Sequence, residues 1–257
     1  EQSCMRIDAT NTFMSSPEWV EDGYSDSAAV VANADLSHAE RLTAAHRLLE
    51  HSLRAGCDVA FAGADVDELV AALLDMAVEA DRLPQVAVKL LWTLACYAGS
   101  TAALESCDAV PMILGILRGT EDTLLASAAL QLLAHMSQSQ SRTLAKQLCS
   151  PKAGALPLLF RCLCRWPDHV QIVMCLLDLV AFALQIPCHR FALGHLPAER
   201  ALPEVLWQVA AKARDMQQSQ DESTPWNRVE ARATQLAREW MLVTSALRLP
   251  SGKNASI

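Results

Sequence analysis

The sequence has few aromatic residues, few glycines and no long apolar run, and each shortage excludes a class of protein. Only 5% of the 257 residues are aromatic, which leaves little material for β-sheets. The nine glycines are scattered singly, so the chain has no glycine-rich loop that could cradle a phosphate. The longest apolar run, Gln171 to Ile186, contains an aspartate and is shorter than the roughly 20 residues that a membrane span needs.

Charge is also scarce, and most of the net charge of −8 lies at one end of the chain. Residues 1–36 contain seven acidic residues and a single basic one. This acidic balance argues against a protein that wraps nucleic acid, because phosphate contacts need clustered Lys and Arg. We expect residues 1–36 to form an acidic, extended arm. Its aromatic residues, Phe13, Trp19 and Tyr24, are candidate anchors for docking into a basic groove of a partner protein.

The nine cysteines do not predict a disulfide framework. Their number is odd and several lie in apolar runs, which favours reduced thiols and an intracellular compartment. The chain starts with Glu rather than Met, so its start is either a mature end after presequence removal or the edge of a trimmed fragment. The first alternative favours an imported protein, for example on the mitochondrial matrix side.

The best candidate metal ligands are Cys162, Cys164, His169, Cys175, Cys188 and His189. Cys162 and Cys164 are too close in sequence for a usual zinc site and Cys175 lies in a predicted buried helix, so we predict no metal or cofactor.

The apolar pattern predicts helices throughout, and we expect an all-α fold. From Ser37 onward, apolar residues follow at steps of three and four, and Glu40 has the spacing of a capping box. Similar periods start near Thr120 and Pro225. These amphipathic helices have too little polar cover to be stable alone.

Three segments resemble one another, and their prolines, Pro111, Pro157 and Pro203, are spaced 46 residues apart. A fourth segment, Val66 to Leu73, fits the same pattern 44 residues earlier with Asp67 in place of Pro. Each is followed by a longer predicted helix. These long helices can be aligned on five apolar anchors, each with a small or β-branched residue four positions earlier: Leu49, Leu91, Leu130, Leu177 and Ala233. Such a period is typical of helical repeat proteins.

The repeated unit resembles the armadillo repeat, whose second helix typically opens with Gly-Ala-Ile-Pro and leucines. The run from Ala153 to Pro157 matches best, whereas Asp108 stands where Gly is usual and the segment before Pro203 departs further. The resemblance covers residues 37–247, about five units. It implies a right-handed α-solenoid with an exposed insert loop over 215–224 and a C-terminal tail over 248–257.

In armadillo proteins the third helices line a concave groove, where importin-like members carry a Trp and, four residues later, an Asn. Here Trp92 takes the place of the Trp, but Cys96 takes that of the Asn. The equivalent positions of the other units supply the remaining candidate groove residues: Glu50, Arg54, Gln131, His135, Asp178 and Phe182, with Thr234 and Arg238 in the last unit. Without the Asn series, the resemblance favours a protein ligand with defined side chains over a basic nuclear signal.

Two functions follow as hypotheses, and both are non-catalytic because the sequence contains no catalytic motif. The first is a protein–protein interaction scaffold, an accessory subunit that bridges partners in a large assembly. Exposed aromatic residues, such as Trp92, Trp166 and Trp226, would mark its contact sites. The second is a regulatory armadillo protein that transiently binds one folded client through the groove. Neither hypothesis involves nucleic acid or a membrane span.

Overall fold

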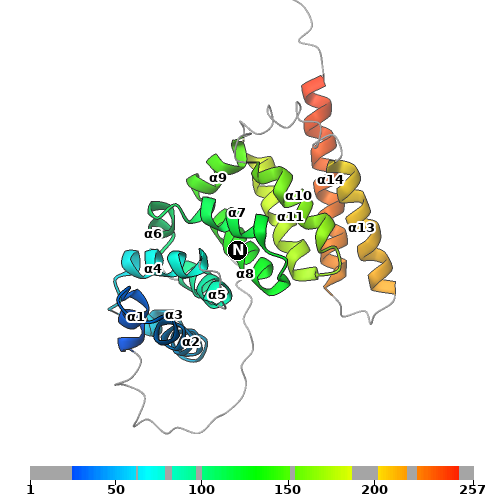
Figure 1. Cartoon of the computed structure of the whole chain (residues 1–257). Coiled ribbons are helices and arrows are strands. Elements are labelled where there is room, and N and C mark those ends of the chain that lie inside the picture. Colours follow the sequence, from blue (N-terminus) through cyan, green and yellow to red (C-terminus); the bar gives the residue numbers. More distant parts are fainter. Residues whose placement is uncertain are drawn as a thin grey trace, which may run out of the picture.

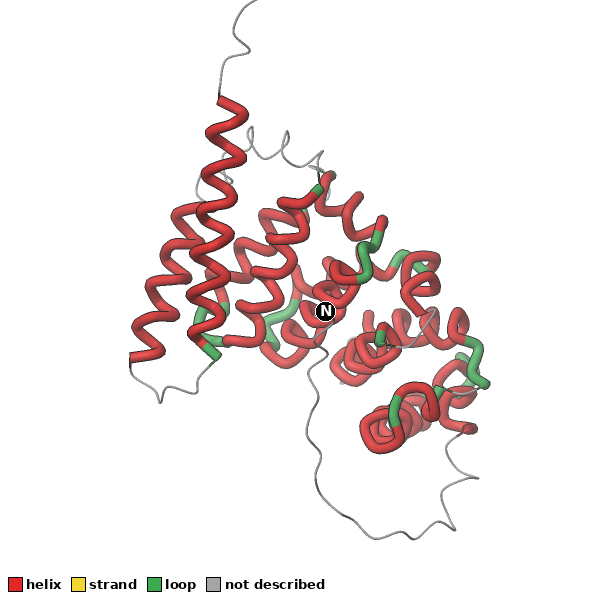
Figure 2. The backbone as a smooth tube through the Cα atoms, turned by 180° about the vertical axis from the view of Figure 1, so that it is seen from behind, coloured by secondary structure: helices red, strands yellow, loops and turns green. Residues whose placement is uncertain are grey.

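The structure, a computed structural model, consists of α-helices joined by short turns. It describes residues 25–61, 63–78, 83–96, 100–150, 154–186, 202–218 and 225–248. No strand occurs in these ranges, and Figure 2 shows helices and connecting loops only. The predicted all-α class is therefore confirmed.

The helices fall into three groups by length and position. The long helices are α2 (His38–Ala55), α5 (Leu83–Ala95), α8 (Thr123–Gln138), α11 (Val170–Gln185) and α14 (Trp226–Arg248). Before each of them comes a helix of the second group: α1 (Ser25–Ala32), α4 (Val66–Val78), α7 (Ala109–Gly119), α10 (Ala155–Arg165) and α13 (Leu202–Gln218). Three short helices complete the described set: α3 (Cys57–Ala60), α6 (Ser100–Ser106) and α9 (Arg142–Cys149).

The long helices form one row, and most of the second group forms another. Helix α2 packs against α5, α5 against α8, α8 against α11, and α11 against α14. In the second row α1 packs against α4, α4 against α7, and α7 against α10, while α13 lies along α14. Figure 1 shows the consequence, because the colours run in sequence order from one end of the molecule to the other. Helices that pack against each other within a row therefore come from consecutive units.

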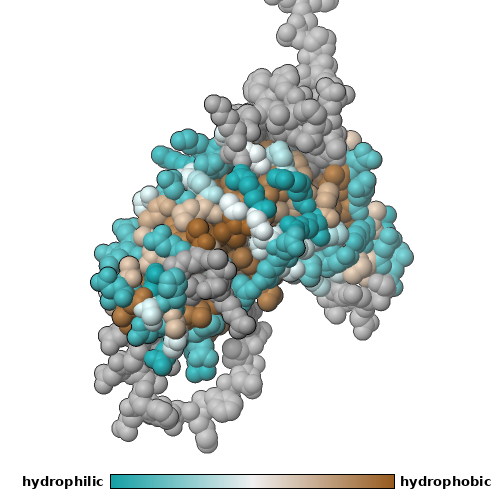
Figure 3. All heavy atoms as spheres, viewed as in Figure 1, coloured by the Kyte–Doolittle hydropathy of each residue, from teal (hydrophilic) through white to brown (hydrophobic). Residues whose placement is uncertain are grey.

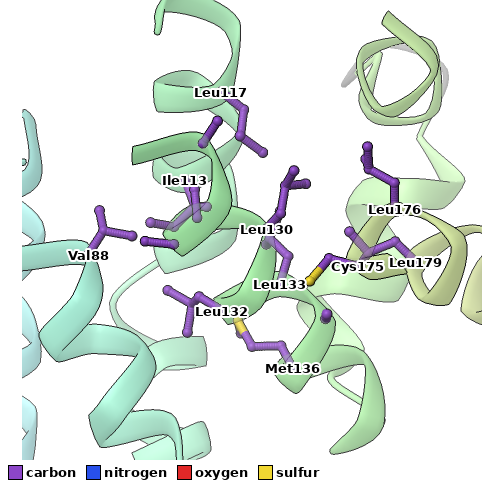
Figure 4. Packing of buried hydrophobic residues seen from close by; sticks show 14 of the residues in the cluster. Val88, Ile113, Leu117, Leu130, Leu132, Leu133, Met136, Cys175, Leu176 and Leu179 are labelled. Carbon is purple, nitrogen blue, oxygen red and sulfur yellow. The ribbon is translucent and has the colours of Figure 1, made fainter. Parts of the chain in front are cut away.

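In the core between the rows, the long helices bury the residues that the alignment of the sequence on its five anchors predicts to be buried. All five residues that lie four positions before the anchors are 0% exposed: Ala45, Ala87, Ala126, Val173 and Val229. Four of the five anchors are also 0% exposed, and Leu49 is partly buried against the same core. In Figure 4, Leu133 of α8 and Cys175 of α11 lie close together in this core. The five long helices therefore bury the same side.

The turns before α7 and α10 repeat as well. Pro111 and Pro157 are each the third residue of their helix, a position where the missing N–H of proline costs nothing. The residue before each helix has a left-handed backbone, with φ of 53° at Asp108 and 59° at Gly154. Pro203 lies in the first turn of α13. The repeated sequence around Pro111 and Pro157 thus corresponds to a repeated structure, in which a left-handed residue is followed by a helix with proline in its first turn.

Ion pairs between successive units also recur at equivalent positions. Arg165, near the end of α10, donates to the backbone oxygen of Thr120 at 3.0 Å and to Glu121 at 2.9 Å. Lys212 of α13 pairs with Asp168 at 2.6 Å. Both the basic and the acidic partners are 47 residues apart in sequence. Each pair links a helix of the second group to the turn before the preceding long helix.

Two predicted boundaries need correction. Residues 25–32 belong to α1 rather than to an extended arm, because Ala28 and Val31 are buried where α1 packs against α2 and α4. A short apolar run between Asp26 and Asp35 was too brief to show a helical period. Helix α13 extends to Gln218, so the insert predicted over 215–224 begins in a helix. Residues 219–224 and 249–257 lie outside the described ranges.

Candidate functional site

The middle long helices expose only one narrow line of side chains each. On α8 these residues follow at steps of three and four, which places them on one side of the helix. The same holds on α5 and α11. Because the three helices bury the same register, their exposed lines face the same way. We call this set the stripe: Gln85, Lys89, Trp92, Cys96, Leu124, Ser127, Gln131, His135, Gln171, Met174 and Asp178.

The α8 part of the stripe combines one exposed apolar residue, Leu124, with the polar residues Ser127, Gln131 and His135. The side-chain amide of Gln131 donates to the hydroxyl of Ser127 at 3.3 Å. His135 is half-buried, and its backbone oxygen accepts hydrogen bonds from the amide and hydroxyl of Ser139 at the helix end. Among the described residues Gln131 has no other side-chain partner, which leaves one amide N–H and the carbonyl oxygen for other contacts. Such an amide can hydrogen-bond the backbone of a bound chain.

Trp92 on α5 presents an apolar ring next to these polar groups. It is partly buried and packs against the core with one part of its indole. The exposed thiol of Cys96 lies one turn further and donates weakly to the backbone oxygen of Trp92 at 3.5 Å. Lys89 lies one turn earlier and is exposed. A half-exposed indole held by a packed helix is a typical contact residue at protein interfaces.

Asp178 closes the stripe at α11, where it meets α14. Its carboxylate lies 3.5 Å from the guanidinium of Arg232 on α14, and both side chains are about one-third exposed. Burial raises the pKa of Asp178, and the nearby Arg232 opposes that shift. The neighbouring Cys175 is buried, and burial raises its pKa to about 12. The ion pair between Asp178 and Arg232 thus connects α14 to α11, and Arg232 already balances the charge of Asp178.

The end helices α2 and α14 expose broader and more charged faces than the middle ones. Glu50 and Arg54 are well exposed on α2 and lie 3.8 Å apart. On α14, Thr234 is half-buried and Arg238 is exposed. Excluding histidines, α2 carries five charged residues and α14 six, whereas α5 and α11 carry one each and α8 none. The predicted groove positions on the end helices therefore lie among more charged residues than those on α5, α8 and α11. Figure 3 shows hydrophilic side chains over both ends of one face and hydrophobic ones between them.

Three predicted contact residues are buried. Phe182 is only 6% exposed and cannot line a groove, because every residue from Ala181 to Leu184 is buried and α8, α9, α10 and α14 all pack against α11. Trp166 and Trp226, at 6% and 4%, are core residues as well. The exposed tryptophan that the sequence analysis missed is Trp207 on α13, at 39%. Its position, 46 residues after exposed Arg161, was the available signal.

The candidate metal ligands do not converge. No group of three or more His, Cys, Asp or Glu side chains in the described ranges could hold a metal ion. Cys162 and Cys175 are buried in different helices, and Cys164 is exposed. Burial raises the pKa of Cys162 to about 11. The two buried cysteines are thus protonated fillers of the core, while Cys188 and His189 lie outside the described residues.

The aromatic anchors predicted for the arm, Phe13, Trp19 and Tyr24, also lie outside the described residues.

Comparisons with protein-family models, with curated proteins and with solved structures find no match to this chain. Among the described helices none alone is long and apolar enough to cross a membrane; the bent pair of α6 and α7 meets that test only jointly, by length and composition.

Proposed function

We propose that the two rows form an armadillo-like, right-handed α-solenoid. The support comes from the succession of packed units, from the common buried register of the long helices and from the left-handed residues before Pro111 and Pro157. In such an array the long helices line the inner side, so the stripe would face the groove.

We further propose that the protein is a non-catalytic scaffold for protein–protein interaction, an accessory subunit that bridges partners in a larger assembly. The observation that carries this proposal is the chemistry of the stripe. It contains three amides, one hydroxyl, two sulfur groups, one leucine, one imidazole and one indole, and its Lys and Asp residues are Lys89 and the already paired Asp178. A neutral, mixed surface suits a protein segment of low charge, whose backbone can bond Gln131 and whose apolar side chains can cover Trp92.

A bridging subunit needs a second contact surface, and the acidic arm is our candidate. Its aromatic residues, Phe13, Trp19 and Tyr24, alternate with acids, a combination that fits a basic groove on another subunit. The reduced cysteines of the protein suit an intracellular compartment, of which the mitochondrial matrix is one example.

The alternative is a regulator that binds one folded client transiently through the same stripe. The narrowness of the stripe favours this alternative, because a single line of side chains per helix buries little area and small interfaces are typical of transient complexes. The lifetime of the complex distinguishes the two. A bridging subunit co-purifies with its assembly, whereas a transient regulator is recovered only after crosslinking.

A photo-crosslinking experiment tests the proposal. A photoreactive amino acid replaces Gln131 in the stripe or, as the matched control, Gln208, which is exposed on α13 outside the long-helix row. The full chain is expressed in its native cells, irradiated, and its adducts are identified by mass spectrometry. We expect a defined protein adduct from position 131 and a weaker, scattered set from position 208. Equal adducts from both positions, or adducts from 208 alone, would contradict the proposal.

A further inference from the structure

Three helices of the second row, α4, α7 and α10, expose the same side. They follow one another along the molecule, and each packs against the next (Figure 1). The repeat aligns two sets of exposed residues, one turn apart: Ala71, Gly115 and Arg161, then Asp75, Gly119 and Arg165. We call the side of α4, α7 and α10 that carries these residues the outer face. None of them belongs to the stripe.

Charge divides the outer face into an acidic and a basic end. The charged residues of α4 are the exposed acids Asp67, Glu68 and Asp75. Those of α10 are the exposed bases Arg161 and Arg165. The three acids form no ion pair with any described residue, and neither does Arg161. The two ends thus carry unbalanced charges of opposite sign.

The basic end contains a groove of about 570 Å³ along α10. The described residues that line it are Pro157, Phe160, Arg161, Cys164 and Arg165. Arg165 is held by Glu121 at 2.9 Å, and its guanidinium lies over the ring of Trp166. The charge of Arg161 is therefore the one in this lining that is left for an acidic occupant.

The middle of the outer face is open to close approach. Helix α7 carries one charged residue there, Arg118, and two exposed glycines, Gly115 and Gly119. No atom lies within 4 Å of the place where a Cβ would be at either glycine. Because glycine has no side chain, the backbone of another molecule can come close to α7.

A twofold axis along α7 makes the outer face complementary to itself. In a twofold pair, each residue contacts its partner position in both directions, so the acidic end of each copy meets the basic end of the other. Arg161 of one copy then comes opposite Ala71 of the other. Ala71 is small, and Glu68 and Asp75 are placed about 4.5 and 6 Å from it along the helix axis, at 1.5 Å per residue.

We propose that two copies of this chain form a twofold-symmetric dimer through their outer faces, with Arg161 of each copy between Glu68 and Asp75 of the other. The occupant of the groove on α10 is thus α4 of a second copy. Complementary charges of this kind fix the orientation of a complex and speed its association. The inference goes beyond the proposed function and does not depend on it. A dimer of this form carries two stripes.

Sedimentation equilibrium of the full chain at low ionic strength tests the inference. We expect a reversible equilibrium between monomer and dimer that shifts toward monomer as salt is added, because at 0.1 M salt exposed charges are screened beyond about 10 Å. A chain that stays monomeric at every concentration, or that forms species larger than a dimer, would overturn the inference.

Charge reversal then locates the contact. Arg161→Glu and Glu68→Arg each bring like charges together, and each should raise the Kd of the dimer at least about tenfold. Both positions are exposed and unpaired, so the fold should be kept, which circular dichroism checks. Arg228→Glu is the matched control, because Arg228 is exposed on α14, outside the outer face.

Mixing the two reversed variants gives the sharpest result. One contact of the mixed dimer has the wild-type pair and the other has the reversed pair, so the mixture should form heterodimers although each variant alone is monomeric. Absence of heterodimers would overturn the inference. So would an unchanged Kd for either variant alone, or an equal loss with Arg228→Glu.

Discussion

Asp108 and Gly154 occupy the same left-handed position immediately before α7 and α10. A side chain at such a position normally costs roughly 1 to 2 kcal/mol, and aspartate is among the few residues that tolerate it. No atom lies within 4 Å of the place where a Cβ would be at Gly154, so a side chain there would meet no steric clash. Its cost would come only from the left-handed backbone conformation.

We therefore expect Gly154→Ala to destabilise the protein by roughly 1 kcal/mol and Asp108→Gly to leave it unchanged or slightly more stable. Urea unfolding followed by circular dichroism measures both. Equal losses from both variants would mean that the two turns are not equivalent.

Four of the described cysteines, also at the residue scale, form an exposed pair and a buried pair, whereas Cys107 is half-buried. Cys96 and Cys164 are exposed, whereas burial raises the pKa of Cys162 to about 11 and that of Cys175 to about 12. Iodoacetamide should label the exposed pair in the native protein and the buried pair only after unfolding, because the thiolate is the reacting form. Peptide mass spectrometry over a time course checks this. Native labelling of Cys175 as fast as that of Cys96 would contradict the packing of α11.

Asp178 predicts a pH effect whose sign follows from its pKa, which burial raises in spite of Arg232. Folding then disfavours the charged carboxylate, so the protein loses stability as the pH rises through the folded pKa. Asp178→Asn should raise Tm at neutral pH and have little effect in acid, where the carboxyl group is protonated in both states. Thermal unfolding across this pH range tests it; a gain confined to acid would show that the sign is wrong.

At the scale of elements, a buried arginine joins the first helices of the array. Arg41 of α2 is 6% exposed, and its guanidinium donates to the backbone oxygens of Val31 in α1 at 3.2 Å and Ala72 in α4 at 3.3 Å. The two rows are thus linked at their N-terminal end by one side chain.

Replacing this residue, Arg41→Met, should destabilise the protein by about 2 to 3 kcal/mol, because it removes hydrogen bonds from a charged donor and leaves buried carbonyls without it. Arg54→Met is the control, since Arg54 is exposed on the same helix and should change stability by no more than about 0.5 kcal/mol. Chemical unfolding of both variants measures the difference. Similar losses would show that Arg41 does not link the helices.

Local sequence signals predicted the elements well where they suffice. The capping box of Ser37 and Glu40 starts α2 as expected, and the five anchors gave the buried side of every long helix. Helix α1 was missed because eight residues show too little of a helical period. Phe182 was misplaced because its burial depends on which helices surround α11, and that arrangement is set by tertiary packing rather than by the repeat.

At the scale of the whole molecule, charge separates the ends of the array from its middle. The middle long helices have neighbours on both sides and carry almost no charge, whereas α2 and α14 are rich in charged residues. This leaves Trp92, Gln131 and Asp178 as a mostly neutral line between two charged ends. The sequence predicts these three positions as groove residues, together with Glu50 and Arg54 on α2, and their role in binding stays a prediction.

The most direct test of the central claim, that the stripe binds protein, is the affinity for the partner that crosslinks to position 131. Kd is measured by calorimetry for the wild type, for Trp92→Ala combined with Gln131→Ala, and for the matched pair Trp207→Ala with Gln208→Ala. The stripe pair should bind at least about tenfold more weakly, or about 1.4 kcal/mol, and the α13 pair should bind like the wild type. An unchanged Kd for the stripe pair, or a loss confined to the α13 pair, would contradict the account.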